Sequence, residues 1–242
     1  MTTDFNKDGH FYIENDIRYP SVTTVLKLIE YDENMLQWAY NMGKYRQDIN
    51  EIKNKACNFG TLTHSNLQSI VDPNMDKEDI LKPNNPFEEF DLKKAINNFK
   101  SLFSDINYDT IYTEHTIIDP IEKYAGTLDW LAIVDNSLWL FDFKTSKRPY
   151  EKYLIQLGAY AHLIEYEGVY HYPDKAGIII ANKFGGSLHP ISKYRLKGYT
   201  DIFLKLNELY QSYTNLDFKY EYEVSPITQE NTSIIDKNKR GE

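Results

Sequence analysis

Three charged side chains lie in two short apolar segments and are of the types that a hydrolytic site needs. Asp129 belongs to the first segment, and Asp142 and Lys144 lie two residues apart in the second. Side chains two apart on a strand share a face, so Asp142 and Lys144 should lie on one face of the strand and Phe141 and Phe143 on the other. If the segments pair as a hairpin, Asp129 lies across from them, near the same end. We therefore expect two carboxylates and one ammonium group to meet there.

Two converging carboxylates form a hard oxygen site of the kind that Mg²⁺ and Mn²⁺ prefer, because these ions keep waters and substrate phosphate as their other ligands. An ammonium group beside the ion stabilises charge on the attacked phosphate or positions the water. The pattern thus predicts phosphodiester hydrolysis. The alternative is that Asp129 belongs to a turn and that Asp142 and Lys144 form an exposed pair on an edge strand, since Asp-x-Lys is common by chance.

The elements that must position these residues divide the chain into a mostly helical part, about 1–105, and a strand-rich part, about 106–215. In the first part we expect a hairpin at 10–13 and 17–19, a helix beginning after Pro20, one or two helices over 49–71 bent near Gly60, a loop over 72–86 and a helix over 87–103. In the second part we expect strands at 110–118, 126–134, 138–144 and 176–181, and helices at 149–166 and 199–213. The tail at about 225–242 is polar, and we expect it to be loose.

This order predicts an α/β fold. We expect one domain over 1–242, in which a mixed central sheet is flanked by helices and preceded by a helical N-terminal elaboration. The first three core strands are expected to be antiparallel. No internal repeat is present in the sequence.

Composition limits the kinds of site that the chain can hold. The single cysteine, Cys57, excludes a disulfide within the chain, a four-cysteine zinc site and an iron–sulfur cluster held by cysteines. Any metal must therefore be held mostly by oxygen and nitrogen. The net charge of −9 argues against binding nucleic acid through bulk charge, although it leaves room for a locally basic cleft.

The N-terminus and the hydropathy pattern bear on location. Asp4 and Asp8 stand where a signal or transit peptide would carry basic residues, and no apolar run approaches the ~18 residues of a membrane span. We expect a cytoplasmic protein without a signal peptide. Heavy use of Lys, Asn and Ile is typical of an AT-rich genome, such as that of a phage or a low-GC bacterium.

Five ordered segments carry a family resemblance: PSVTTV (20–25), GTLTH (60–64), GTLD (126–129), DFK (142–144) and QLGAY (156–160). In this order and spacing they resemble the PD-(D/E)XK nuclease superfamily, in particular its RecB-like branch with the mitochondrial genome maintenance exonucleases and related phage exonucleases. The resemblance covers roughly residues 20–165. It implies a restriction-endonuclease-like core that acts with Mg²⁺ or Mn²⁺. The cysteines that hold an iron–sulfur cluster in some relatives are absent.

The resemblance also implies roles for particular residues. Asp129 and Asp142 would bind the metal, with the backbone carbonyl of Phe143 as an additional ligand. Lys144 would be the catalytic lysine. His64 would ligate or orient the metal, and its imidazole suits Mn²⁺ better than Mg²⁺. Taken alone, His64 is more typical of an ordinary helix histidine bonded to solvent or backbone, and only the resemblance reverses this preference.

Three further candidates flank this set. Gln156 and Tyr160 are four apart on an expected helix, so they share a face, and in the family this pair supports the site and contacts nucleic acid. The alternative is an amphipathic helix with one polar boundary residue. Glu114 lies on the preceding strand, where many relatives carry an acid near the metal. Its neighbour His115 should point the other way, so at most one of the two enters the site.

Contacts with nucleic acid are predicted less specifically. The 21–24 segment is explained by helix capping, and phosphate contact from its hydroxyls or from the helix N-terminus is only a secondary prediction. The charges after Lys144 suit a strand backbone, although such runs are more often simply solvated. The candidates are Ser21, Thr23, Thr24, Thr145, Ser146, Lys147, Arg148 and Lys152.

The function expected from the relatives is that of a DNA exonuclease acting on ends, including single strands, in replication, recombination or repair. One alternative is a structure-specific or restriction-like endonuclease. Another is a non-catalytic nucleic-acid-binding protein on the same fold, which predicts eroded ligands, whereas here the carboxylates, lysine, histidine, glutamine and tyrosine are all present.

Overall fold

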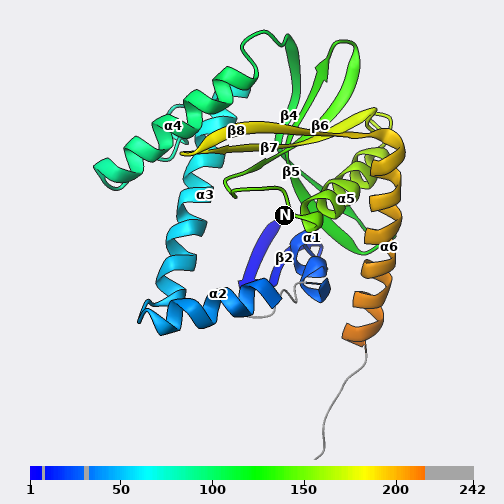
Figure 1. The fold of residues 1–242 in the computed structure, drawn as a ribbon. Coiled ribbons are helices and arrows are strands. Elements are labelled where there is room, and N and C mark those ends of the chain that lie inside the picture. Colours follow the sequence, from blue (N-terminus) through cyan, green and yellow to red (C-terminus); the bar gives the residue numbers. More distant parts are fainter. Residues whose placement is uncertain (7–8, 30–32, 216–242) are drawn as a thin grey trace, which may run out of the picture. The chain divides into compact units, whose positions relative to one another are not determined.

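The computed structural model describes residues 1–6, 9–29 and 33–215, so the predicted loose tail at about 225–242 lies outside the described residues. Figure 1 shows its elements, which run in the order β1 (Thr2–Asn6), β2 (Gly9–Glu14), β3 (Ile17–Pro20), α1 (Val22–Val25), η1 (Leu26–Ile29), α2 (Glu33–Lys44), α3 (Ile49–Val71), α4 (Pro86–Leu102), β4 (Tyr108–Asp119), β5 (Tyr124–Val134), β6 (Ser137–Lys144), α5 (Glu151–Glu167), β7 (Lys175–Asn182), β8 (Gly185–Ser192) and α6 (Lys193–Asn215). Here η1 is a short 3₁₀ helix.

A five-stranded sheet forms the centre of the fold, in the order β4-β5-β6-β7-β8. All neighbours are antiparallel except β6 and β7, which run parallel. Helix α5 makes the crossover between those two strands, as parallel pairing requires. The predicted α/β fold with a mixed sheet flanked by helices is confirmed.

One face of the sheet is covered by α5 and α6. Leu140 and Ile178 of the sheet belong to one buried cluster with Leu157 of α5 and Phe203 of α6. At Gly158 the two helices approach so closely that a Cβ atom would lie 2.5 Å from the backbone nitrogen of Thr200. Burying each large apolar side chain contributes roughly 1.5–3 kcal/mol, so this layer fixes α5 firmly on the sheet.

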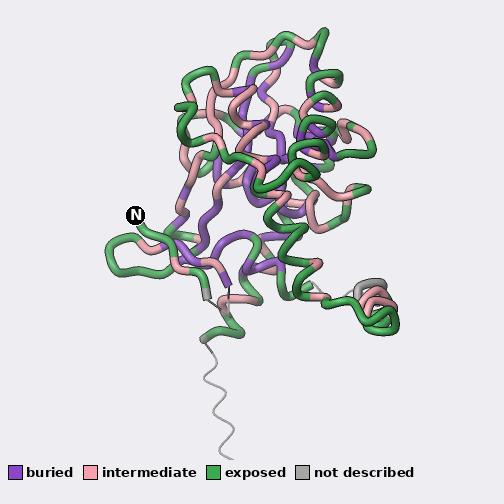
Figure 2. Tube along the Cα trace, turned by 90° about the vertical axis from the view of Figure 1, so that its left-hand side faces the viewer, coloured by how far each residue is buried: buried purple, intermediate pink, exposed green. Residues whose placement is uncertain are grey.

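The opposite face is covered by α3 and α4. Phe99 of α4 packs among Trp130, Phe141 and Phe143 of the sheet, with ring centroids 5.8 to 6.4 Å apart in the two pairs that Phe99 makes with Trp130 and Phe143. Figure 2 shows the buried positions gathered inside the larger part of the chain, and none of the described side chains of α2 is buried. Phe141 and Phe143 therefore face α3 and α4, as their alternation with Asp142 predicts.

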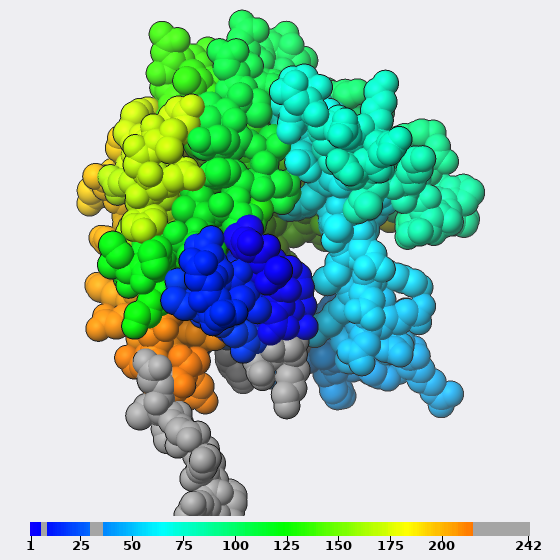
Figure 3. Space-filling view, turned by 180° about the vertical axis from the view of Figure 1, so that it is seen from behind, coloured from blue at the N-terminus to red at the C-terminus, as the bar shows by residue number. Residues whose placement is uncertain are grey.

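A separate three-stranded sheet, β1-β2-β3, precedes this core. Its β2–β3 hairpin is the predicted one, and the turn residues Asn15 and Asp16 both have positive φ angles, 50° and 61°, as a tight hairpin turn of this hand requires. In Figure 3 these N-terminal strands, in blue, lie against the green part of the chain. The contact includes a bridge between Ser21 and Ala125 of β5.

Several elements differ from the sequence-based expectation. Strands β1 and β8 and helix α2 were not predicted, and α6 begins at Lys193 rather than at 199. Strand β8 could not be recognised from its sequence, because it contains Gly185, Gly186 and Pro190, which are weak strand formers. Such residues are tolerated there because β8 is an edge strand. Of the one or two helices expected over 49–71, the structure has one: α3 runs through Gly60 without interruption and has 23 residues. Among the described residues, no helix combines the length and apolar character needed to cross a membrane.

Candidate active site

The site begins where β5 and β6 separate. Their backbone pairing ends at Trp130 and Phe141. Two residues further along β6, the backbone N–H of Phe143 donates instead to Oδ2 of Asp129 at 2.6 Å. Phe143 remains paired with Ile179 of β7 on its other side. The Asp129 carboxylate thus takes the place of a backbone acceptor and is fixed over the end of β6.

Glu114 faces Asp129 from β4. The paired residues on either side are Thr113 with Trp130 and His115 with Leu128, so Glu114 and Asp129 lie opposite one another. Glu114 has a φ angle of 45°, which is uncommon for a residue other than glycine and costs on the order of 1–3 kcal/mol where surrounding structure imposes it. Such strained positions concentrate at functional sites.

His115 points away from the site, as the alternation of a strand predicts for one member of this pair. Its Nε2 lies 2.7 Å from Glu167 Oε1 at the end of α5, and its ring stacks on Tyr112. Of the two neighbours, only Glu114 directs its side chain toward Asp129.

His64 reaches the same place from α3. Its Nδ1 lies 3.5 Å from Oδ2 of Asp129, and its ring meets the edge of Phe143 with centroids 5.9 Å apart. One ligand atom each from His64, Glu114 and Asp129 lie within 4.8 Å of one another. Helix α3 and the neighbouring strands β4 and β5 therefore bring one nitrogen and two carboxylates together.

Asp142 and Lys144 lie beside this group on β6. The Lys144 Nζ is 2.5 Å from Asp142 Oδ2, and the Asp142 side chain is fully buried. Within the described part of the chain, Asp142 Oδ1 has no hydrogen-bond partner. Burial, opposed by Lys144, raises the pKa of Asp142 to about 6. Asp142 is not one of the three converging groups, and its nearest partner is the lysine rather than His64 or Glu114.

The charges of the site are strongly interdependent. Burial would raise the pKa of Asp129, but His64 and Lys144 outweigh it and lower that pKa. Burial disfavours the charged forms of His64 and Lys144, yet the neighbouring aspartates raise both pKa values above their ordinary range. Although Glu114 is an exposed residue, burial of its carboxyl group and the charge of Asp129 raise its pKa to about 7. The raised pKa values of Glu114 and Asp142 show that the site holds more carboxyl groups than it can keep ionised. A bound cation would favour their ionised forms.

Gln156 and Tyr160 support the site from α5. The Gln156 amide donates to the Tyr160 hydroxyl at 2.8 Å, and both side chains are buried. Burial, then the charges of Asp142 and Asp129, raise the pKa of Tyr160 well above its ordinary value, so the phenol keeps its proton. Gly126 makes room for this ring, because a Cβ there would lie 2.7 Å from Tyr160 Cε1.

The donor set suits a divalent cation. Carboxylate oxygens with one imidazole nitrogen are ligands of Mn²⁺ and, without the nitrogen, of Mg²⁺. Two observations fit such an ion. Oδ1 of the buried Asp142 has no partner among the described residues, and His64, Glu114 and Asp129 converge beside it. The group of converging atoms does not include the Phe143 carbonyl, so that ligand stays a prediction.

Comparison with known proteins adds little. No family model and no curated protein matches the chain. A solved structure, "Crystal structure of SSO0001", is similar with a TM-score of 0.29 and 15% sequence identity over 50% of this chain. The match spans 61% of that protein, less than two thirds of its length. A likeness at this level is too slight to bear on fold or function.

The predicted hydroxyl contacts with nucleic acid need correction at two positions. Ser21 caps α1 by accepting the N–H of Thr24, and the Thr24 hydroxyl donates to the carbonyl of His10. Both side chains are buried, so their hydroxyls are used inside the protein. Only Thr23 of this group is exposed.

The polar segment after Lys144 lies at the same end of the sheet. Thr145 lies near α3, since its hydroxyl would be 3.7 Å from a Cβ placed on Gly60. The Ser146 hydroxyl donates to the carbonyl of Arg148. Lys147 and Arg148 are exposed. Lys152 is half-buried on α5.

Sequence reasoning missed one neighbour of the lysine. The ring of Tyr153 lies 4.9 Å from Lys144 Nζ, close enough for a cation–π contact. Tyr153 precedes Gln156 by three residues on α5, so it shares that helix face, and this spacing was the available signal.

Proposed function

We propose that this protein is a metal-dependent nuclease of the RecB-like branch of the PD-(D/E)XK superfamily, with a restriction-endonuclease-like core. The observation that carries the proposal is the meeting of His64, Glu114 and Asp129 within 4.8 Å, beside the buried Asp142–Lys144 pair. A turn aspartate and an exposed edge pair, the alternative for these residues, do not predict burial of Asp142 or its position in the middle of the sheet.

The residues have distinct roles in this proposal. His64, Glu114 and Asp129 hold the ion, and Asp142 supplies a further carboxylate. A bound Mg²⁺ or Mn²⁺ would polarise a phosphoryl oxygen of the substrate and lower the pKa of a water molecule, which is the nucleophile. Lys144 carries its positive charge at any working pH, because its pKa is raised, and stabilises negative charge developing on the attacked phosphate.

Tyr160 and Gln156 position these groups rather than react. Tyr160 remains protonated, and its hydroxyl is held by Gln156 at 2.8 Å. The Tyr153 ring restrains the lysine from the same helix. Helix α5 therefore acts as the rigid support against which the strand ends are aligned.

The substrate class follows from the family resemblance. We infer an exonuclease that acts on DNA ends, including single strands, in replication, recombination or repair. The exposed cations Lys147 and Arg148 next to Lys144 support a strand backbone entering from that side.

Digestion of end-labelled DNA tests the proposal. Single-stranded and duplex DNA, linear and circular, would be incubated with Mg²⁺ or Mn²⁺ and with the wild type or Lys144→Ala. We expect linear DNA to be shortened from its ends, no cutting with chelator, and a loss of at least a hundredfold in Lys144→Ala, as for removal of one charge-stabilising donor. Cleavage of circles overturns the exonuclease assignment, and equal activity of the variant overturns the site.

Metal binding is tested separately by thermal unfolding. Mn²⁺ should raise the melting temperature of the wild type, because a ligand that binds only the folded state stabilises it. Asp142→Ala and Glu114→Gln should lose most of this shift. Asp109→Ala is the matched control, since Asp109 is an exposed carboxylate on the same strand as Glu114. An unchanged shift in the site variants would show that the ion binds elsewhere.

A further inference from the structure

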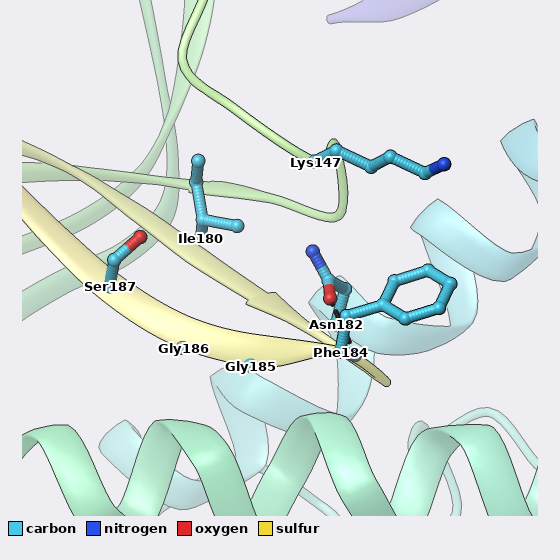
Figure 4. Close-up of a pocket in the computed structure, with 7 residues that line it drawn as sticks. All are labelled: Lys147, Ile180, Asn182, Phe184, Gly185, Gly186 and Ser187. Carbon is cyan, nitrogen blue, oxygen red and sulfur yellow. Dashed lines mark hydrogen bonds between the residues drawn. The ribbon is translucent and has the colours of Figure 1, made fainter.

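A cavity of about 360 Å³ opens at the turn between β7 and β8, within the size range of ligand sites. Its lining includes Lys147, Ile180, Asn182, Phe184 and Ser187. Figure 4 shows the side chains of Lys147 and Phe184 extending in the same direction, with Asn182 between them. The cavity therefore joins the segment that follows the catalytic strand to the end of the β7–β8 hairpin.

The cavity lies in line with the proposed active site. Lys144 of β6 is paired with Ile180 of β7, and Ile180 is paired with Ser187 of β8. Side chains of paired residues project from the same face of a sheet. A row thus runs from Lys144 across two strands into the cavity, a distance of roughly 10 Å at the usual strand spacing.

Asn182 ties the two sides of the cavity together. Its amide nitrogen donates to the carbonyl of Ser146, and its oxygen accepts the N–H of Phe184, both at 2.8 Å. Asn98 of α4 donates to the Asn182 carbonyl at 2.7 Å. The side chain is buried and both of its polar ends are used, so Asn182 braces the cavity.

Phe184 projects from the hairpin tip beside the cavity, and its residue is 72% exposed. Lys147 Nζ lies 5.5 Å and Lys183 Nζ 5.6 Å from the centre of its ring. Lys183 is neutralised by Asp91 at 2.7 Å, whereas Lys147 makes no ion pair with any described residue. An exposed ring beside an unpaired cation offers a stacking surface and a phosphate contact side by side.

We propose that Phe184 stacks on a base of a single-stranded nucleic acid while Lys147 contacts the adjoining phosphate, in a subsite next to the cleavage centre. This inference rests on the proposed nuclease function and extends it to the path of the strand. Aromatic stacking accepts any base, so the subsite favours unpaired strands without selecting a sequence. A duplex cannot use the ring, because its bases are already stacked.

Fluorescence anisotropy with a labelled twelve-nucleotide DNA strand, in chelator so that it stays uncut, tests the stacking. Phe184→Ala should raise the Kd about tenfold, the order expected for one lost base stack. Phe5→Ala is the matched control, since Phe5 is also 72% exposed but belongs to the N-terminal sheet. Its Kd should equal that of the wild type. Both variants should melt like the wild type, because neither ring is buried.

Strands with one abasic nucleotide at successive positions locate the stacked base. An abasic nucleotide at one position should weaken binding by the wild type about tenfold. The same strand should bind Phe184→Ala no more weakly than the intact strand does, because the ring and the missing base are partners. Lys147→Gln should instead lower the slope of log Kd against log salt by about 0.7, the value for one phosphate contact on a single strand.

The outcomes separate this inference from the function beneath it. If wild type and Phe184→Ala bind the strand equally, if duplex binding falls as much as single-strand binding, or if the wild type binds no strand, the stacking subsite is wrong. Cleavage with an unchanged Kd in Phe184→Ala overturns the subsite alone. Weaker binding by Phe184→Ala, together with no metal-dependent cleavage by the wild type, overturns the nuclease alone.

Discussion

Oδ2 of Asp129 accepts the backbone N–H of Phe143 at 2.6 Å, two residues past the last backbone pair between β5 and β6. One carboxylate oxygen therefore closes the gap between two strands and also faces His64. The Asp129 side chain thus has a structural role, as acceptor of the Phe143 N–H, and a proposed catalytic role. Substitutions of Asp129 should separate the two.

Substitution of Asp129 by Asn and by Ala should give equal catalytic loss but unequal stability. Asn retains an oxygen that accepts the Phe143 N–H, whereas Ala leaves this buried donor without a partner at a cost of ~1–3 kcal/mol. Urea unfolding should show Asp129→Ala to be less stable than Asp129→Asn by that amount, with cleavage abolished in both. Full activity of Asp129→Asn would exclude Asp129 as a metal ligand.

Glycine at position 114 should be better tolerated than alanine. Both substitutions remove the carboxylate, but only glycine adopts a φ angle of 45° without steric cost. After the greater freedom of glycine in the unfolded chain is allowed for, Glu114→Gly should exceed Glu114→Ala in unfolding free energy by about 1 kcal/mol. Equal stability of the two variants would mean that the backbone at 114 relaxes once the carboxylate is gone.

Gly126→Ala should disturb the site without touching a charged group. The added Cβ would lie 2.7 Å from Tyr160 Cε1 and 3.0 Å from Val22 Cγ2. We expect a loss of ~1–3 kcal/mol in stability, typical of overpacking, and reduced cleavage because the Tyr160 ring moves. Gly198→Ala is the control: apart from its own helix backbone and chain neighbours, no atom of the described residues lies within 4 Å of its Cβ position, and Ala favours the helix there. Unaltered activity of Gly126→Ala would remove Tyr160 from the site.

Asp174 should make stability depend on acid pH. Burial opposes ionisation, but the N–H of Leu138 and the ammonium of Lys193 outweigh it and lower the pKa of Asp174. A lowered pKa in the folded protein gives stability that is complete above the unfolded value near 4 and is lost as pH falls through the folded value. The side chain is 37% exposed, so solvent screening limits the gain to at most ~1 kcal/mol.

Thermal unfolding of Asp174→Asn at several pH values measures this contribution. At pH 7 the variant should melt below the wild type, and near pH 2 the two should converge. A difference that persists undiminished at the lowest pH would assign the effect of Asp174 to hydrogen bonding alone rather than to its charge.

Local patterns were sufficient for much of the central sheet. The alternation of Phe141 and Phe143 with Asp142 and Lys144 predicted which face each would occupy, because a strand has only two faces. The parallel pairing of β6 with β7 and the edge position of β8 depend on partners distant in sequence. The local sequence around Gly185 does not indicate pairing with β7, so β8 was not predicted.

The candidate site shows the same limit. Spacing placed Asp142 with Lys144 and Gln156 with Tyr160, since each pair lies on one element. Glu114, which the resemblance also offered as a candidate, converges with His64 and Asp129 from a residue with a φ angle of 45°, whereas Asp142 does not belong to this group. Backbone angles imposed by tertiary structure leave no signal in a single sequence. The resemblance supplied His64, which its local sequence would have left as an ordinary helix residue.

The close approach at Gly158 has a consequence for how the protein could be inhibited. Gly158 lies between Gln156 and Tyr160 in sequence, and its carbonyl accepts the Thr200 hydroxyl of α6 at 2.7 Å. Alignment of the proposed cleavage centre therefore depends on a helix crossing that contributes no side chain to the proposed chemistry. If the proposed function holds, a compound that wedged α5 away from α6 would act as an allosteric inhibitor, because it would tilt the helix that aligns the proposed metal ligands and leave those ligands unobstructed.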